Sequence, residues 1–180
     1  MQTKEIILDD FEKAIEKELR NLNRIKLGEQ SNEWWTNSVK NKVAIAVRNK
    51  NKICKIYASG CNEGLTDGPE WLYDLTCRIE ENDYIKNILL VLESEWKNSK
   101  NKCYKENIRY DFEKLLVSRS KYRVIVLEAN NDKEKEDIVG QLRKCIEQFQ
   151  DSNIGDRYLF ACWKQNKNER KFDFSVYVVS

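Results

Sequence analysis

Two acidic residues, Glu93 and Glu95, follow directly on a run of apolar residues. The run, Ile-Leu-Leu-Val-Leu at residues 88–92, is too short for an isolated helix and partly β-branched, so it predicts a strand buried on both faces. Because the side chains of a strand alternate, Glu93 and Glu95 are expected to point to the same face. Carboxylates placed in this way are suited to binding a hard cation.

A second pair of acids, Glu70 and Asp74, lies on the preceding predicted strand, residues 70–80. The same alternation places both on one face of that strand. If the two strands pair, up to four carboxylates gather at the end of a buried sheet, where they would repel one another and lose their hydration. A divalent metal such as magnesium relieves both costs, because hard cations take oxygen ligands. The spacing therefore predicts a metal site that draws on Glu70, Asp74, Glu93 and Glu95.

The elements that must position these acids follow from the periodicity of the apolar residues. Spacings of three and four residues predict helices, and short apolar runs predict strands. The predicted helices are residues 9–27, 31–46, 108–119 and 132–150, and the predicted strands are residues 55–59, 70–80, 85–96, 123–127, 158–163 and 172–179. A meander followed by a strand–helix–strand crossover indicates an α/β fold with a mixed central sheet flanked by helices, in a single domain over residues 1–180.

The composition narrows the possible chemistry. The chain has no histidine, which excludes Ser-His-Asp and Cys-His catalysis and every histidine zinc site. None of its six cysteines forms a C-x-x-C pair, which argues against a zinc ribbon or a thioredoxin motif. No apolar run approaches the ~20 residues of a membrane span or forms the core of a signal peptide, so we expect a cytoplasmic protein with no membrane partner. A net charge of +2 neither requires nor excludes nucleic acid.

Residues 31–127 have the element order helix, three strands, helix, strand, with Asp74 on the second strand and Glu-Ser-Glu at residues 93–95 ending the third. Together with the segment Asp-Phe-Glu-Lys-Leu-Leu at residues 111–116, this order resembles the PD-(D/E)xK, or restriction-endonuclease-like, superfamily of nucleases. The resemblance implies a nuclease-like core, extended by the helix at residues 9–27 and by the helix and two strands at residues 132–179.

For function, the resemblance implies that Asp74 and Glu93 bind magnesium or manganese. The metal would polarise a scissile phosphate of DNA or RNA and lower the pKa of an attacking water. Nucleases of this type often pair to cut two strands, which makes a homodimer possible.

The third position of the family motif is usually a lysine, and here it is Glu95. The resemblance implies for Glu95 either a second-metal ligand or a base that orients water. In other members the lysine comes from the next helix, which indicates Lys114. On a helical wheel, however, Lys114 lies about 200° from Phe112, the centre of the buried stripe, so it is expected to face solvent. Arg119 falls on the stripe, and Glu33 on the second helix is a further candidate acid.

Two plainer interpretations remain open. The acids can form a solvated rim on an ordinary sheet, paired with some of the many lysines. The missing lysine of the motif also suits a non-catalytic relative that keeps the fold and acts as a protein interaction or regulatory module. A lysine-rich loop at residues 97–105 could hold a phosphate backbone, and it also has the composition of any exposed loop in this chain.

Overall fold

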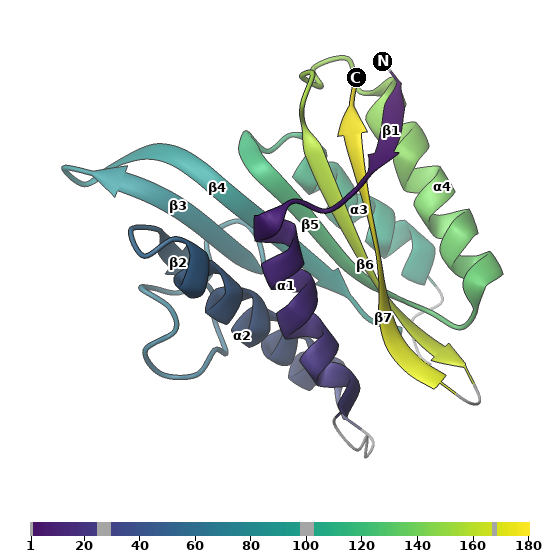
Figure 1. Ribbon diagram of the computed structural model, residues 1–180, viewed down its shortest axis with the longest axis horizontal. Helices are drawn as coiled ribbons and strands as arrows, with labels where there is room; N and C mark the ends of the chain where they lie inside the picture. Colours follow the sequence, from purple (N-terminus) through teal and green to yellow (C-terminus); the bar gives the residue numbers. More distant parts are fainter. Residues whose placement is uncertain (1, 25–29, 98–102, 167–168) are drawn as a thin grey trace.

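A computed structural model describes residues 2–24, 30–97, 103–166 and 169–180 of the chain. Within these residues the strands form one mixed sheet in the order β1-β7-β6-β5-β4-β3-β2 (Figure 1). The strands are β1 (Thr3–Ile6), β2 (Lys55–Tyr57), β3 (Leu75–Glu81), β4 (Tyr84–Glu95), β5 (Ser120–Ala129), β6 (Arg157–Asn166) and β7 (Glu169–Val179). The three central strands, β4, β5 and β6, are parallel to one another, and the other neighbouring strands pair antiparallel.

Helices cover both faces of the sheet (Figure 1). They are α1 (Asp10–Arg20) with the short 3-10 helix η1 (Asn21–Arg24), α2 (Asn32–Lys50), α3 (Tyr104–Leu116) and α4 (Asp132–Gln148). The apolar side chains of α1 and α2 pack in one core with Leu90, Leu92 and Val124 from the sheet. Those of α3 and α4 pack in a second core on the opposite face with Val91 and Ile125. The expected α/β fold with a mixed sheet flanked by helices is therefore confirmed.

Each of three helices begins at a side chain that accepts a backbone N–H. Asp9 accepts from the backbone of Glu12, whose carboxylate accepts from Asp9 N in return. The Ser31 hydroxyl accepts from Trp34 N at the start of α2, and the Asn131 side chain accepts from Glu134 N at the start of α4. Such caps satisfy N–H groups that have no partner inside the helix. The first helix ends earlier than expected, at Arg20, and residues 25–27 of the prediction lie outside the described residues.

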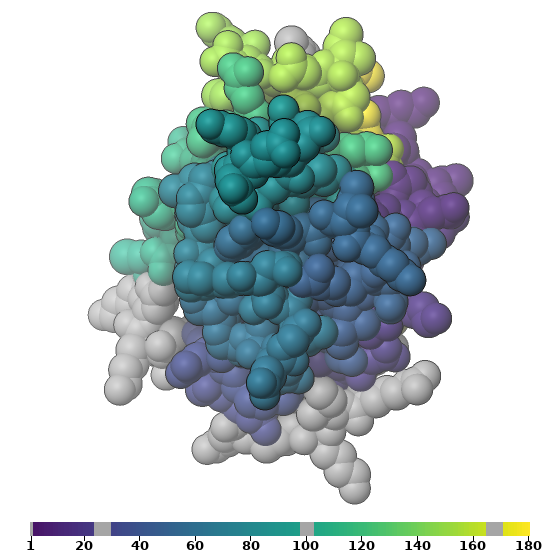
Figure 2. Space-filling model, turned by 90° about the vertical axis from the view of Figure 1, so that its left-hand side faces the viewer, coloured from purple at the N-terminus to yellow at the C-terminus, as the bar shows by residue number. Residues whose placement is uncertain are grey.

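The apolar run at residues 88–92 lies in β4, as expected, and its side chains enter both cores. The first residues of β4 are exposed, since the β3–β4 hairpin projects from the body of the sheet (Figure 1). Seen from that end, the middle of the surface is formed by the blue residues that precede β3 together with the teal residues of the hairpin (Figure 2). The part of β4 that carries Glu93 is therefore central and buried, while its beginning is open to solvent.

The strand expected at residues 70–80 is shorter in the structure, where β3 begins only at Leu75. The reason is a turn around Leu72, which has φ +64°, in which Tyr73 N donates to the carbonyl oxygen of Trp71 (2.8 Å). The alternation assumed for Glu70 and Asp74 therefore does not hold, and that premise was wrong.

Other elements also differ from the predictions; for example, α2 extends to Lys50 and β5 covers Ser120–Ala129. The edge strand β1 was not predicted, because its four residues are largely polar and pair only with β7. The helix expected at residues 108–119 is α3, which begins at Tyr104 and ends at Leu116. No helix in the described part of the chain combines the length and the apolar character needed to cross a membrane.

Candidate functional site

The ammonium group of Lys114 lies 2.5 Å from Oε1 of Glu93. Glu93 is near the end of β4 and its side chain is only 4% exposed, whereas Lys114 is on α3 and its side chain is 33% exposed. The helical-wheel prediction that Lys114 faces solvent was wrong. Its long stem reaches from the flank of α3 to the sheet, and the Tyr73 hydroxyl donates to the Lys114 carbonyl oxygen (3.3 Å) and so places the 70–74 segment against that flank.

Asp74 lies beside this pair and is held by β4. Its Oδ2 accepts hydrogen bonds from the backbone N and from the hydroxyl of Ser94, each at 2.8 Å. The Ser94 hydroxyl also contacts Thr36 Oγ1 of α2 at 3.2 Å. Because a strand N–H points in the plane of the sheet, Asp74 lies at the edge of β4 just beyond the first residue of β3, and from there its charge acts on Glu93, Glu95 and Asp111.

Two more acids complete the group, which we call the carboxylate–lysine site and define as Asp74, Glu93, Glu95, Asp111 and Lys114. Glu95 Oε1 accepts a hydrogen bond from the side-chain amide of Asn107 on α3 (3.0 Å). Asp111 lies one helical turn before Lys114 and contacts its ammonium at 3.4 Å. Sequence reasoning did not assign a role to Asp111, although its spacing of three residues from Lys114 on one helix flank was a usable signal.

Burial raises the pKa values of three acids in this site, Glu93, Glu95 and Asp111. It raises the pKa of Glu93 to about 8, with a further contribution from the charge of Asp74, and the opposing effect of Lys114 is smaller. The pKa of Glu95 and that of Asp111 are also raised, first by burial and then by neighbouring acids. Burial lowers the pKa of Lys114, but its contacts with Glu93 and Asp111 outweigh this effect and the net shift is upward. Lys114 therefore stays protonated at neutral pH.

Other predicted residues lie elsewhere. Glu70 faces Lys40 of α2 at 3.7 Å, with a side chain that is 44% exposed, because the turn at Leu72 separates it from Asp74. Arg119 is exposed and follows the end of α3, so the cation that reaches the acids is Lys114 instead. Glu33 is exposed in the first turn of α2.

The lysine-rich loop contributes two described side chains, and the charges of both act on Glu134 of α4. Lys97 forms an ion pair with Glu134 of α4 at 2.6 Å, and Lys105 is exposed at the start of α3. Lys100 and Lys102 lie outside the described residues. Lys97 therefore contributes to the packing of α4, in contact with another part of the chain.

The carboxylates at the site are better suited to magnesium than to a metal that takes all its ligands from the protein. Among the described residues, no three acidic or cysteine side chains are grouped so as to hold a metal ion. Magnesium does not require three, because it commonly keeps several waters and uses one or two carboxylates together with substrate phosphate. Asp74 and Glu93 could supply those carboxylates, and a cation would stabilise the buried negative charge of Glu93.

Comparison of the chain with protein-family models, with curated proteins and with solved structures finds no match. What can be said of function therefore rests on the site itself and on the fold that positions it.

Proposed function

We propose that this protein is a metal-dependent nuclease with a restriction-endonuclease-like core, in which Asp74 and Glu93 bind magnesium or manganese. The observation that carries the proposal is the contact of 2.5 Å between Glu93 and Lys114, with Asp74 beside it. The family motif brings together an acid of the second strand, an acid of the third strand and, in some members, a lysine from the next helix. Their counterparts here are Asp74 directly before β3, Glu93 on β4 and Lys114 on α3. Here they come from three separate segments of the chain.

The side chains divide the work of phosphodiester hydrolysis. Lys114 keeps its proton and can donate it in a hydrogen bond to a phosphate oxygen, stabilising the charge that develops there. Glu95, oriented by Asn107 and with a raised pKa, is suited to accept a proton from water. Bound magnesium would polarise the phosphate and lower the pKa of the water. The site would thus combine carboxylates that bind the metal, a base that accepts a proton from water, and a lysine that stabilises charge on the phosphate.

The test is cleavage of end-labelled single- and double-stranded DNA and RNA with Mg²⁺ or Mn²⁺. We expect cleavage of at least one substrate, reduced about a hundredfold or more by Asp74→Asn, Glu93→Gln and Lys114→Met. Glu106→Gln removes an exposed acid of α3 and Lys133→Met removes an exposed lysine of α4, so both serve as matched controls. Cleavage that survives all three site substitutions would contradict the assignment.

A specific observation also supports the second candidate, a non-catalytic relative that acts as an interaction or regulatory module. The raised pKa keeps Glu93 largely protonated at neutral pH, and Ser94 already satisfies Asp74, so the acids are stable without a metal. This candidate predicts no cleavage of any of the four substrates and no heat of binding when Mg²⁺ or Mn²⁺ is titrated at millimolar concentration. A metal-binding signal lost in Asp74→Asn would instead favour the nuclease.

A further inference from the structure

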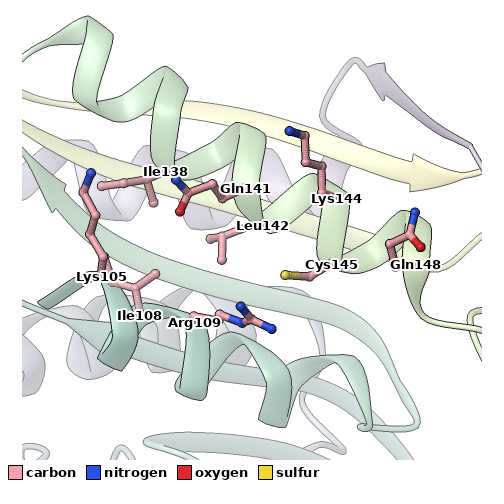
Figure 3. A pocket seen from close by; sticks show the side chains of 9 residues that line it. All are labelled: Lys105, Ile108, Arg109, Ile138, Gln141, Leu142, Lys144, Cys145 and Gln148. Carbon is pink, nitrogen blue, oxygen red and sulfur yellow. The ribbon is translucent and has the colours of Figure 1, made fainter. Parts of the chain in front are cut away.

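A groove of about 350 Å³ lies between α3 and α4, on the other flank of α3 from the carboxylate–lysine site (Figure 3). Its volume is at the lower end of the range for small-molecule sites. Figure 3 shows Leu142 and Cys145 directed from α4 toward α3, with Arg109 across the groove. The residues that line it all belong to α3 and α4.

The floor of the groove is apolar. Ile108, Ile138 and Leu142 belong to the core between the helices and the sheet, and each is at most 3% exposed. Cys145 packs against the same core, and burial raises the pKa of its thiol, so the thiol is neutral at pH 7. Because the three core side chains are almost fully buried, a hydrocarbon or aromatic ligand would mainly cover Cys145 and the methylene stems of the longer lining side chains.

The rim of the groove is cationic. Lys105 and Arg109 stand on α3, and Lys144 stands on α4. Arg109 pairs from Nε with Glu113, which is not one of the lining residues (2.8 Å). Among the nine described residues that line the groove none is acidic, while two glutamines add amide donors. The lining residues therefore carry a net positive charge that attracts an anion, although Glu113 offsets part of the charge of Arg109.

We propose that this groove binds a small amphiphilic anion, an aryl or alkyl carboxylate or sulfonate. Its apolar body lies on Ile108, Leu142 and Cys145, and its charged group contacts the cations of the rim. Both parts of the ligand are needed. A surface ion pair alone contributes little to the free energy of binding, and apolar contacts alone do not select an anion over a neutral ligand. The site is independent of the proposed nuclease activity.

The probe is 1-anilinonaphthalene-8-sulfonate, titrated into the full chain and followed by fluorescence. N-phenyl-1-naphthylamine has the same aromatic body without the sulfonate, so we expect it to bind about tenfold more weakly. Lys105→Gln, Arg109→Gln and Lys144→Gln should each weaken sulfonate binding by about threefold or more. Lys133→Gln, on the same helix as Lys144 but outside the groove, should leave it unchanged. Cooperative thermal unfolding verifies that each variant is folded.

Alkylation by iodoacetamide locates the bound probe. We expect the sulfonate to slow modification of Cys145, measured on its peptide by mass spectrometry, and not that of Cys103, which is exposed and outside the groove. Decanoate, an alkyl carboxylate, should compete with the probe and protect the same thiol. Equal affinity for the neutral dye, unchanged binding in all three rim variants, no protection of Cys145, or no binding at about 1 mM probe would each overturn the proposal.

Discussion

The carboxylate of Asp74 accepts two hydrogen bonds from Ser94, from its backbone N and from its hydroxyl, both at 2.8 Å. Asp74 precedes β3 by one residue, and the last paired residues of the two strands are Leu75 and Leu92. The side chain of Asp74 therefore takes over from the backbone as the partner of β4 where the β3 ladder stops. One acid thus has a structural role and a proposed chemical one.

The two roles of Asp74 can be separated by substitution. Asp74→Ala leaves the buried N–H of Ser94 without its acceptor, so we expect a loss of about 1–3 kcal/mol in the free energy of unfolding, measured by urea denaturation. Asp74→Asn keeps an amide oxygen in the same place and should lose less than half as much. Equal losses in the two variants would show that the hydrogen bond to Ser94 is not what stabilises this end of β4.

Glu93 should make stability depend on pH. Its pKa is raised to about 8 in the folded protein, against roughly 4.3 for an unfolded glutamate, so the folded state binds this proton more tightly. The resulting stabilisation is complete below pH ~4 and is lost as the pH rises through about 8, at no more than about 1.4 kcal/mol per pH unit. Glu93→Gln should flatten this slope, measured by denaturation between pH ~5 and ~9.

The control for the pH experiment is Glu106→Gln, which removes an exposed acid of α3. It should retain the slope of the wild-type chain. A slope that is the same in the wild type and in Glu93→Gln would mean that another group binds the proton.

Glu93 and Lys114 should be energetically coupled. A double-mutant cycle with Glu93→Gln and Lys114→Met is expected to give a coupling energy of about 1–3 kcal/mol at pH ~9, where Glu93 is ionised. The coupling should be smaller at pH ~6, because a protonated Glu93 has no charge for Lys114 to stabilise. Effects that add to within about 0.5 kcal/mol at both pH values would contradict the ion pair.

The turn before Asp74 should be relieved by glycine. Leu72 has φ +64°, a conformation that costs a residue with a side chain about 1–2 kcal/mol, and it is 67% exposed, so little packing is lost on substitution. We expect Leu72→Gly to be neutral or to stabilise by about 1 kcal/mol in thermal denaturation. Val117→Gly is the matched control, since Val117 is equally exposed but has φ −80°, and it should destabilise the protein. Similar losses in both variants would argue against strain at Leu72.

Periodicity predicted the layered fold because the strongest signals come from buried elements. The run at residues 88–92 could only be a strand with both faces covered, and it lies between the two cores as expected. The apolar stripes of α1 to α4 predicted these helices for the same reason, because one face of each helix is buried against the sheet. The edge strand β1 gave no such signal, since its pairing with β7 comes from residues at the far end of the sequence.

The site was predicted less well because it depends on local backbone geometry. The positive φ at Leu72 interrupts the strand that was predicted to place Glu70 and Asp74 on one face. A leucine rarely adopts this conformation, so the sequence does not indicate the turn. The helical wheel predicted a solvent-facing Lys114 because it considers only the direction of the Cα–Cβ bond. The long lysine side chain can extend along the side of α3 and reach Glu93. Glu93 lies near the end of β4, as the apolar run before it predicted, whereas Asp74 precedes β3 instead of lying within it.

The pairing of β1 with β7 has a consequence for the order of folding. Thr3 lies opposite Val179, so this ladder joins residues from nearly opposite ends of the sequence (Figure 1). Long-range pairing carries the entropy cost of closing the intervening chain before it gains any contact, unless the rest of the sheet has already brought the ends together. The four-residue strand β1 is therefore expected to join last, and its amides should be among the first of the sheet to exchange with solvent deuterium.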